Sequence, residues 1–176
     1  MALKTGAVNL ASAGGLTAFA SARIATQQSA NIAANDHLKF DTVDAVEGTE
    51  IIPDTTTAYV TTQGAASVGR FLLHGSPNAG LTYRLQFNAG YVLFSGATGL
   101  LELQFYDATN GAVIPGGTVS IVAATDAGHD GGSSSMEAVF TPLSDVLVEV
   151  RILVATALTR IGTTASRFPT VFISLL

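Results

Sequence analysis

Hydrophobic and polar residues alternate along much of the chain, most clearly between residues 81 and 107. Over residues 81–88 and again over 101–105, the odd positions are apolar and most even positions are polar. A period of two is typical of a strand with one face in a core and the other facing a polar environment. The pattern predicts two such strands, with a glycine-containing break between them in which residues 91–94 form a strand covered on both faces.

Short β-type runs bounded by Gly, Pro, Asn and Asp recur on both sides of this block. An Asn-Gly pair marks a tight turn at 107–111, and Pro-Gly-Gly at 115–117 predicts another. About ten strands and no strong helical pattern after residue 36 predict an antiparallel sandwich or barrel. The remaining strands are expected at 35–43, 50–53, 58–62, 69–74, 118–123, 135–142, 145–155 and 167–176.

Residues 1–35 are rich in Ala, Ser, Thr and Gly, and their apolar residues are thinly spaced. We expect an N-terminal arm over 1–35, either extended or partly helical with a modest helix over 16–34, and a separate domain over 36–176. The arm either orders against a partner or remains a leader without a specific role. Asn9 and the pair Gly14-Gly15 interrupt any apolar run long enough for a signal peptide. No stretch approaches the ~20 apolar residues of a membrane span.

The chain is apolar and weakly charged, with 48% hydrophobic and 12% charged residues among 176. A typical domain carries about 25% charged residues, so an oligomer or a larger assembly would leave less uncharged surface in water. An ordinary monomer with a surface rich in Thr, Ser, Asn and Gln is the alternative. Cysteine is absent, which excludes a disulfide framework and any cysteine-ligated metal site.

The net charge of −5 is concentrated in an acidic run over residues 36–54. The sequence has no cluster of basic residues that would bind a phosphate backbone, so nucleic-acid binding is disfavoured. The acidic run could pair with a basic surface on a partner, or it could bind calcium. The interpretation we favour is a solvated edge that opposes strand-to-strand aggregation.

Candidate chemistry is sparse. Asp126, His129 and Asp130 share a glycine-rich loop, but their spacing matches no calcium-loop pattern. A Ser-His-Asp hydrolase needs a nucleophile on a rigid turn, and no G-x-S-x-G motif is present. His37 and His74 each stand alone near predicted strand ends. The sequence therefore predicts no cofactor, no metal and no enzymatic activity.

Four stretches carry a family resemblance: HLKFDTV, GLTYRLQFNAGYVLFS, GLLELQFYDATNG and the apolar C-terminal RFPTVFISLL. Together they resemble the tumour necrosis factor-like jelly roll, a superfamily that includes the globular heads of complement-type trimers. The resemblance spans residues 36–176 and implies a ten-stranded jelly roll that forms a homotrimer, with its last strand near the threefold axis. On that likeness the trimer interface would consist of Phe168, Val171, Phe172, Ile173 and Leu175.

Domains of this kind also occur in bacteriophages, as capsid decoration (cement) proteins and as fibre tips. The resemblance thus implies a non-enzymatic virion protein on the outer capsid surface, bound to the major capsid protein or another virion protein, without nucleic acid or membrane. A receptor- or glycan-binding tip that meets the host through loop 125–135 is the alternative, and a hydrolytic jelly roll is a third. The capsid-binding arm would use Leu3, Lys4, Val8, Leu10, Leu16, Phe19, Arg23 and Ile24.

Overall fold

A computed structural model describes residues 18–25, 33–54, 68–78, 80–93, 99–123, 130–131, 134–155, 160–162 and 168–176. The strands are β1 (Phe19–Arg23), β2 (Thr42–Glu47), β3 (Ile51–Asp54), β4 (Arg70–Leu73), β5 (Tyr83–Asn88), β6 (Tyr91–Leu93), β7 (Gly99–Asp107), β8 (Ala112–Ala123), β9 (Asp130–Gly131), β10 (Ser135–Phe140), β11 (Val146–Ala155), β12 (Arg160–Gly162) and β13 (Thr170–Leu175). No helix long and apolar enough to cross a membrane occurs in the described part.

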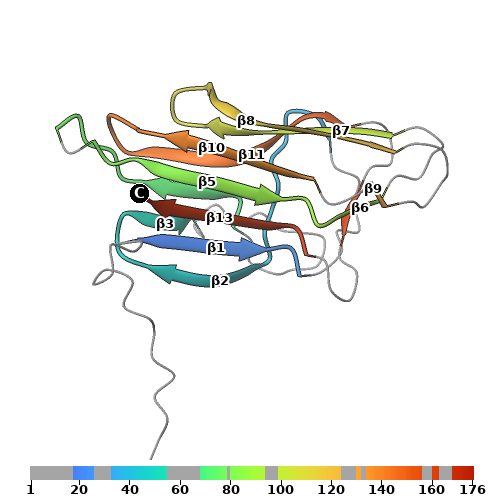
Figure 1. Ribbon diagram of the computed structural model, residues 1–176, viewed down its shortest axis with the longest axis horizontal. Coiled ribbons are helices and arrows are strands. Elements are labelled where there is room, and N and C mark those ends of the chain that lie inside the picture. The colour runs from blue at the N-terminus through green and yellow to red at the C-terminus, as the bar shows by residue number, and fades with distance from the viewer. Residues whose placement is uncertain are drawn as a thin grey trace, which may run out of the picture.

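Ten of these strands form a sandwich of two five-stranded antiparallel sheets, ordered β10-β5-β13-β1-β2 and β3-β4-β11-β7-β8. The first and last strands of the sandwich lie side by side, with β13 between β5 and β1 (Figure 1). A small third sheet, β12-β6-β9, lies at one end of the molecule (Figure 1). The prediction of an all-β, ten-stranded jelly-roll sandwich is confirmed.

The core follows from the period-two patterns that predicted the strands. In β5 the alternate residues Tyr83, Leu85 and Phe87 are buried, while Arg84 and Asn88 are exposed. Burying one apolar side chain of this size contributes about 1.5–3 kcal/mol. Because the inward residues of both sheets meet in one cluster, the two sheets stabilise each other.

Of the two forms expected for the N-terminal arm, the described residues 18–25 are extended, and the helix over 16–34 is wrong for them. Phe19–Arg23 is a strand that pairs with β13 on one side and β2 on the other. Ala20 and Ala22 point inward and are fully buried, so small side chains let the strand pack close to the second sheet. The sandwich therefore begins before residue 36, and residues 18–25 belong to it rather than to a separate arm.

The turn predicted at 115–117 is also wrong, because β8 continues through it. The pairing with β7 shifts register between Gln104 and Tyr106, so the Pro-Gly-Gly residues bulge out of the ladder. Gly116 has a φ of +85°, and a Cβ on Gly117 would lie 2.6 Å from Phe105. These glycines permit a bulge rather than a chain reversal. The turn predicted at 107–111 is present, with Gly111 at a φ of +68°.

Candidate functional site

The outward side of the sheet β10-β5-β13-β1-β2 is the best candidate for a functional surface, and we call it the β13 face. Strand register sets its side chains in rows across the sheet. One row runs from Glu137 through Gln86 and Phe172 to Ser21, and the next runs from Ser135 through Asn88 and Thr170 to Arg23. The face therefore carries mostly uncharged polar side chains around a single aromatic position on β13.

Two aromatic rings form the centre of this face. Phe172 of β13 stacks on Phe19 of β1, with ring centroids 5.8 Å apart, and both residues are only partly buried. Nearby, the Arg23 guanidinium lies 5.3 Å from the Phe168 ring and 2.6 Å from the Asp44 carboxylate. Partly exposed aromatic pairs are typical of surfaces that bury area against a partner.

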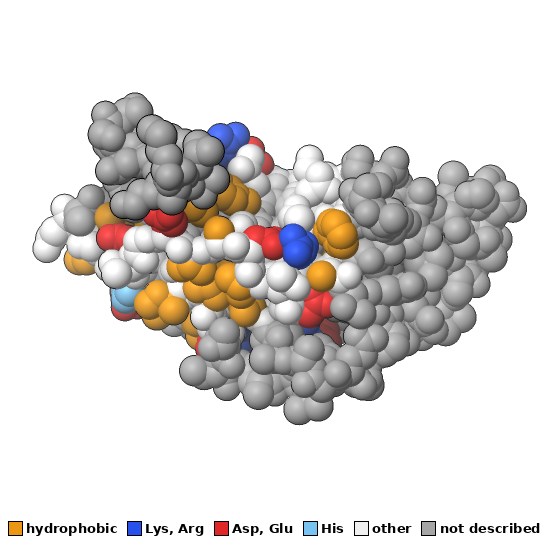
Figure 2. Space-filling model, turned by 90° about the horizontal axis from the view of Figure 1, so that it is seen from below, with side chains coloured by type: hydrophobic (Ala, Val, Ile, Leu, Met, Phe, Trp, Pro, Cys, Tyr) orange, Lys and Arg blue, Asp and Glu red, His pale blue; other side chains and the backbone are white. Residues whose placement is uncertain are grey.

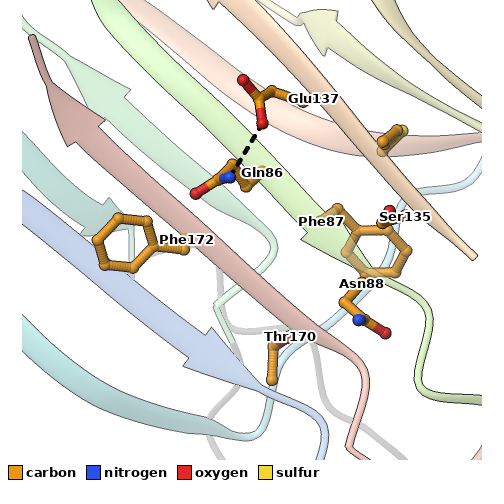
Figure 3. A pocket seen from close by; sticks show the side chains of 8 residues that line it. Gln86, Phe87, Asn88, Ser135, Glu137, Thr170 and Phe172 are labelled. Atoms are coloured by element: carbon orange, nitrogen blue, oxygen red, sulfur yellow. Dashed lines mark hydrogen bonds between the residues drawn. The ribbon is translucent and has the colours of Figure 1, made fainter. Parts of the chain in front are cut away.

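A second charged pair lies on β5 and β10. The Arg84 guanidinium donates two hydrogen bonds to Glu137, each 2.9 Å. The Gln86 amide donates a third, of 3.0 Å, which Figure 3 shows as a dashed line. The hydrogen bonds from Arg84 and then Gln86 lower the pKa of Glu137, and the bonds that Arg84 donates to Glu137 raise the pKa of Arg84. Glu137 is therefore ionised at neutral pH, which suits hydrogen-bond acceptance and does not suit proton donation.

An open groove of about 390 Å³ crosses the β13 face where β10, β5 and β13 run together. Figure 3 shows amide, hydroxyl and carboxylate groups along it, with the Phe172 ring at one side. Its lining residues are Gln86, Phe87, Asn88, Ser135, Met136, Glu137, Thr170 and Phe172. Such a mixture can hydrogen-bond a polar ligand or the polar surface of a neighbouring subunit.

The structure separates the residues predicted for the trimer interface. Val171 and Ile173 point into the chain's own core and are at most 1% exposed, and Leu175 is buried as well. Phe172 alone among the β13 residues of that set points outward, and Phe168 lies beside Arg23 before the strand begins. Successive strand residues alternate between faces and cannot all reach one partner, so only Phe172 and Phe168 of this set remain candidates for such a contact.

The residues predicted for the capsid-binding arm fall into three groups: some lie outside the described part, two lie on the β13 face, and one lies in the core. Leu3, Lys4, Val8, Leu10 and Leu16 lie outside the described residues. Phe19 and Arg23 lie on the β13 face, next to Phe172 and Phe168. Ile24 is 1% exposed within the core, so its assignment to a capsid contact is wrong.

The structure describes some, but not all, of the histidines and loop carboxylates that the sequence analysis named. Asp126 and His129 lie outside the described residues, and Asp130 is described only as part of the β9 backbone. Neither His37 nor His74 stands alone: His74 Nδ1 is 2.9 Å from Asp145, and His37 Nδ1 is 3.8 Å from Glu149. The described residues contain no group of three or more His, Asp or Glu placed to hold a metal ion.

A buried carboxylate on the other sheet escaped the sequence analysis. Glu149 of β11 is 2% exposed, although it points outward, because two arginines cover it. Its carboxylate lies 2.8 Å from Arg70 Nε and 2.6 Å from Arg151 Nη2. The Arg151 guanidinium also stacks 3.3 Å above the Tyr106 ring. Alternation placed Glu149 and Arg151 on a polar face, but no local pattern connects Glu149 to Arg70, 79 residues away.

No protein-family model and no curated protein matches this chain. Solved structures match this chain at low identity. Murine APRIL matches with 11% identity and a TM-score of 0.45, over 90% of this chain and 98% of APRIL. The stem and receptor-binding domain of spike protein P1 from bacteriophage PM2 matches with 10% identity and a TM-score of 0.41, over 92% and 67% of the two chains. A xylanase 10B fragment of Clostridium thermocellum, with CBM22-1 and GH10 modules, matches with 13% identity and a TM-score of 0.27, over 88% and 28%.

Proposed function

We propose that the protein is a non-enzymatic structural protein of a bacteriophage virion. It forms a homotrimer through the β13 face and decorates the outer surface of the capsid, where it stabilises the shell. Residues 1–17 attach it to the major capsid protein or to another virion protein. A trimer that bridges neighbouring shell subunits makes several weak contacts at once, so the combined attachment is strong although each contact is weak.

The arrangement of the β13 face is the observation that carries this proposal. An aromatic pair, Phe19 and Phe172, lies among mostly neutral side chains, while Arg23 pairs with Asp44 and Arg84 pairs with Glu137 at the sides. Protein interfaces have this composition, with an apolar centre, few unpaired charges and a polar rim. Low overall charge, 12% of residues, also supports a chain that works in an assembly.

Sedimentation velocity of the full chain tests the trimer. The wild type is expected at three times the 18.0 kDa chain mass, and Phe172→Asp at one. A carboxylate at the centre of the interface would be desolvated without a partner, which opposes association. Val113→Asp, at a half-exposed position on β8, is the matched control and should remain trimeric. Monomeric wild type would overturn the proposal.

Binding to particles assembled without this protein tests the attachment. Deletion of residues 1–35 would remove β1 and leave β13 and β2 without their shared neighbour. The deletion therefore ends at residue 17, which keeps the sandwich. We expect a folded trimer that no longer binds particles; full particle binding by this truncated chain would remove the role assigned to the arm.

The groove on the β13 face favours a second candidate, a receptor- or glycan-binding tip of a fibre or spike. Its amide and hydroxyl groups beside Phe172 are suited to the hydroxyls and the apolar side of a sugar ring. A trimer through the same face would close the groove, so the two functions compete for one surface. A monomer that binds oligosaccharides and loses binding on Asn88→Ala would favour the tip over the decoration protein.

A further inference from the structure

The open backbone edge of the sandwich at β2 borders the β13 face, with Glu47 next to Phe19, and the trimer proposal, which is centred on Phe172 and Phe19, does not use this edge. We call it the β2 edge and define it by Val43, Val46, Glu47, Glu50 and Ile52. Among the described residues, β2 is the last strand of its sheet, paired only with β1. Seen from this side, hydrophobic side chains gather on the surface among acidic ones (Figure 2).

A bulge makes the edge apolar on one side. Ala22 pairs with Val43 and Ser21 pairs with Ala45, so Asp44 is an extra residue in β2. The extra residue keeps both Val43 and Val46 on the core side of the sheet, although they are three positions apart. They nevertheless remain 38% and 44% exposed, and Ile52 beyond the following turn is 44% exposed.

The same edge is negatively charged. Residues 42–54 contain four carboxylates and no lysine or arginine. Arg23, on the neighbouring strand β1, pairs with Asp44. Glu47 is exposed at the end of β2. Backbone hydrogen bonds, from Thr49 first, lower the pKa of Glu50, so its carboxylate is charged at neutral pH. A ligand of this edge therefore has to combine apolar and cationic groups.

We propose that the β2 edge binds an extended segment of a partner virion protein in which small apolar residues alternate with lysine or arginine. This inference rests on the proposed attachment to a particle. The segment would pair with the open backbone edge of β2, place its apolar side chains on Val43 and Val46, and place its cations near Glu47 and Glu50. Strand addition supplies affinity through main-chain hydrogen bonds and specificity through alternate side chains.

The position of the N-terminal segment supports this orientation. Ala18 packs at the end of β2, where a Cβ on Gly48 would lie 2.6 Å from the Ala18 Cβ. The described part of the chain therefore begins, at Ala18, beside the end of β2. If residues 1–17 attach the protein to a particle, as proposed, the β2 edge lies near the point of attachment.

Two other occupants fit the edge less well. A second copy pairing through its own β2 would bring identical carboxylates together, and like charges facing each other oppose strand pairing. The chain's own residues 1–17 would have to cross over β2, because Phe19 pairs on the opposite side of that strand, and neighbouring elements rarely connect across another strand in this way.

Fluorescence anisotropy with synthetic peptides tests the proposal on the full chain. The probe is a short labelled peptide that repeats Lys-Val-Thr-Val, and its matched control repeats Glu-Val-Thr-Val. We expect only the lysine peptide to bind. Glu47→Lys and the double change Val43→Ser with Val46→Ser should each weaken it about tenfold or more, a loss that corresponds to roughly 1.4 kcal/mol. Val113→Ser, an exposed valine on β8, should bind as the wild type does.

Four results would overturn the proposal: no binding of either peptide, equal binding of both, equal loss with Val113→Ser, or unchanged binding by the β2 variants. Tighter peptide binding by Leu10→Asp would identify the chain's own N-terminal segment as the occupant instead. A lower sedimentation mass for the double change Val43→Ser with Val46→Ser, whose side chains lie on the side of the sheet away from the β13 face, would identify a second copy. None of these outcomes depends on the mass of Phe172→Asp, so this inference and the proposed trimer can fail separately.

Discussion

The outward faces of the two sheets handle their charged residues in opposite ways. We call the outward side of the sheet β3-β4-β11-β7-β8 the β11 side. There the Glu149 carboxylate is almost fully buried beneath Arg70 and Arg151. On the β13 face, Arg84 and Glu137 form an equally short pair, but both side chains are 45% exposed. On the β11 side, arginine stems and guanidinium groups cover the surface. On the β13 face, aromatic rings occupy the centre.

This difference indicates which face has partners for its charged groups within the same chain. Arginine side chains cover apolar and polar surface with their stems and planar heads, as Arg151 does over Tyr106. The β11 side thus satisfies its charged groups without a partner. On the β13 face the paired charges lie to the sides of Phe19 and Phe172, which leaves a neutral, partly apolar area available for contact. The predictions below test this contrast.

The largest effect is expected for Glu149→Ala. Removing the carboxylate leaves two arginines, each about one quarter exposed, without their shared counter-charge. Breaking a buried pair in this way costs about 3 kcal/mol, at the lower end of the usual range because the partners reach water. For a chain of this length we expect the melting temperature to fall by about 6–12 °C. Thermal unfolding followed by circular dichroism measures it.

Glu137→Ala is the matched control on the β13 face. It removes a carboxylate that accepts hydrogen bonds from Arg84. Because the Arg84 and Glu137 side chains are both exposed, water replaces the lost hydrogen bonds. We expect no measurable change in melting temperature. If Glu137→Ala destabilises the chain as much as Glu149→Ala, the contrast between the two faces is wrong.

A smaller effect is expected for Phe172→Ser, which removes the stack on Phe19. The chain should lose about 1 kcal/mol in its free energy of unfolding, since an aromatic pair contributes roughly 0.5–1.5 kcal/mol. Urea denaturation at a concentration where the protein is monomeric measures this loss apart from association. A loss as large as that of Glu149→Ala would mean that Phe172 belongs to the core of the single chain.

Much of the fold could be predicted from alternation alone, and the errors have physical causes. The strands β5 and β7 were predicted because their alternating residues meet one core. β1, with the sequence FASAR, was missed because alanine carries little apolar signal and favours helices by itself. Its strand form depends on pairing with β13 and β2, and such tertiary partners override local preference.

The candidate surfaces were less predictable than the strands. RFPTVFISLL is apolar on both faces, so alternation could not separate Phe172, which points outward, from Val171 and Ile173, which are buried. The Glu149 cluster joins strands that are distant in sequence, and the β2 edge depends on one bulge at Asp44. These features arise from register between strands, which a single sequence does not display.

The smallest expected effect is a pH dependence centred on His37, at the border of the β11 side. Burial, the largest cause, lowers the pKa of His37 below 6.5; Arg70 and Lys39 lower it further, while Glu149 and Asp36 oppose the shift. The unfolded chain therefore takes up a proton at higher pH than the folded chain does. Stability is full above the unfolded pKa and falls as the pH drops through 6.5 toward the folded pKa.

Carboxylates with lowered pKa values, such as Glu137 and Asp145, lose their contributions only below about pH 4.5. The difference in melting temperature between the wild type and His37→Gln, measured from pH 7.5 to 5.5, therefore reports the contribution of His37. We expect the wild type to lose stability over this interval and His37→Gln, which cannot take up the proton, to lose less. A steeper fall in His37→Gln would mean that the neighbouring carboxylates outweigh burial and that the site favours the charged imidazole.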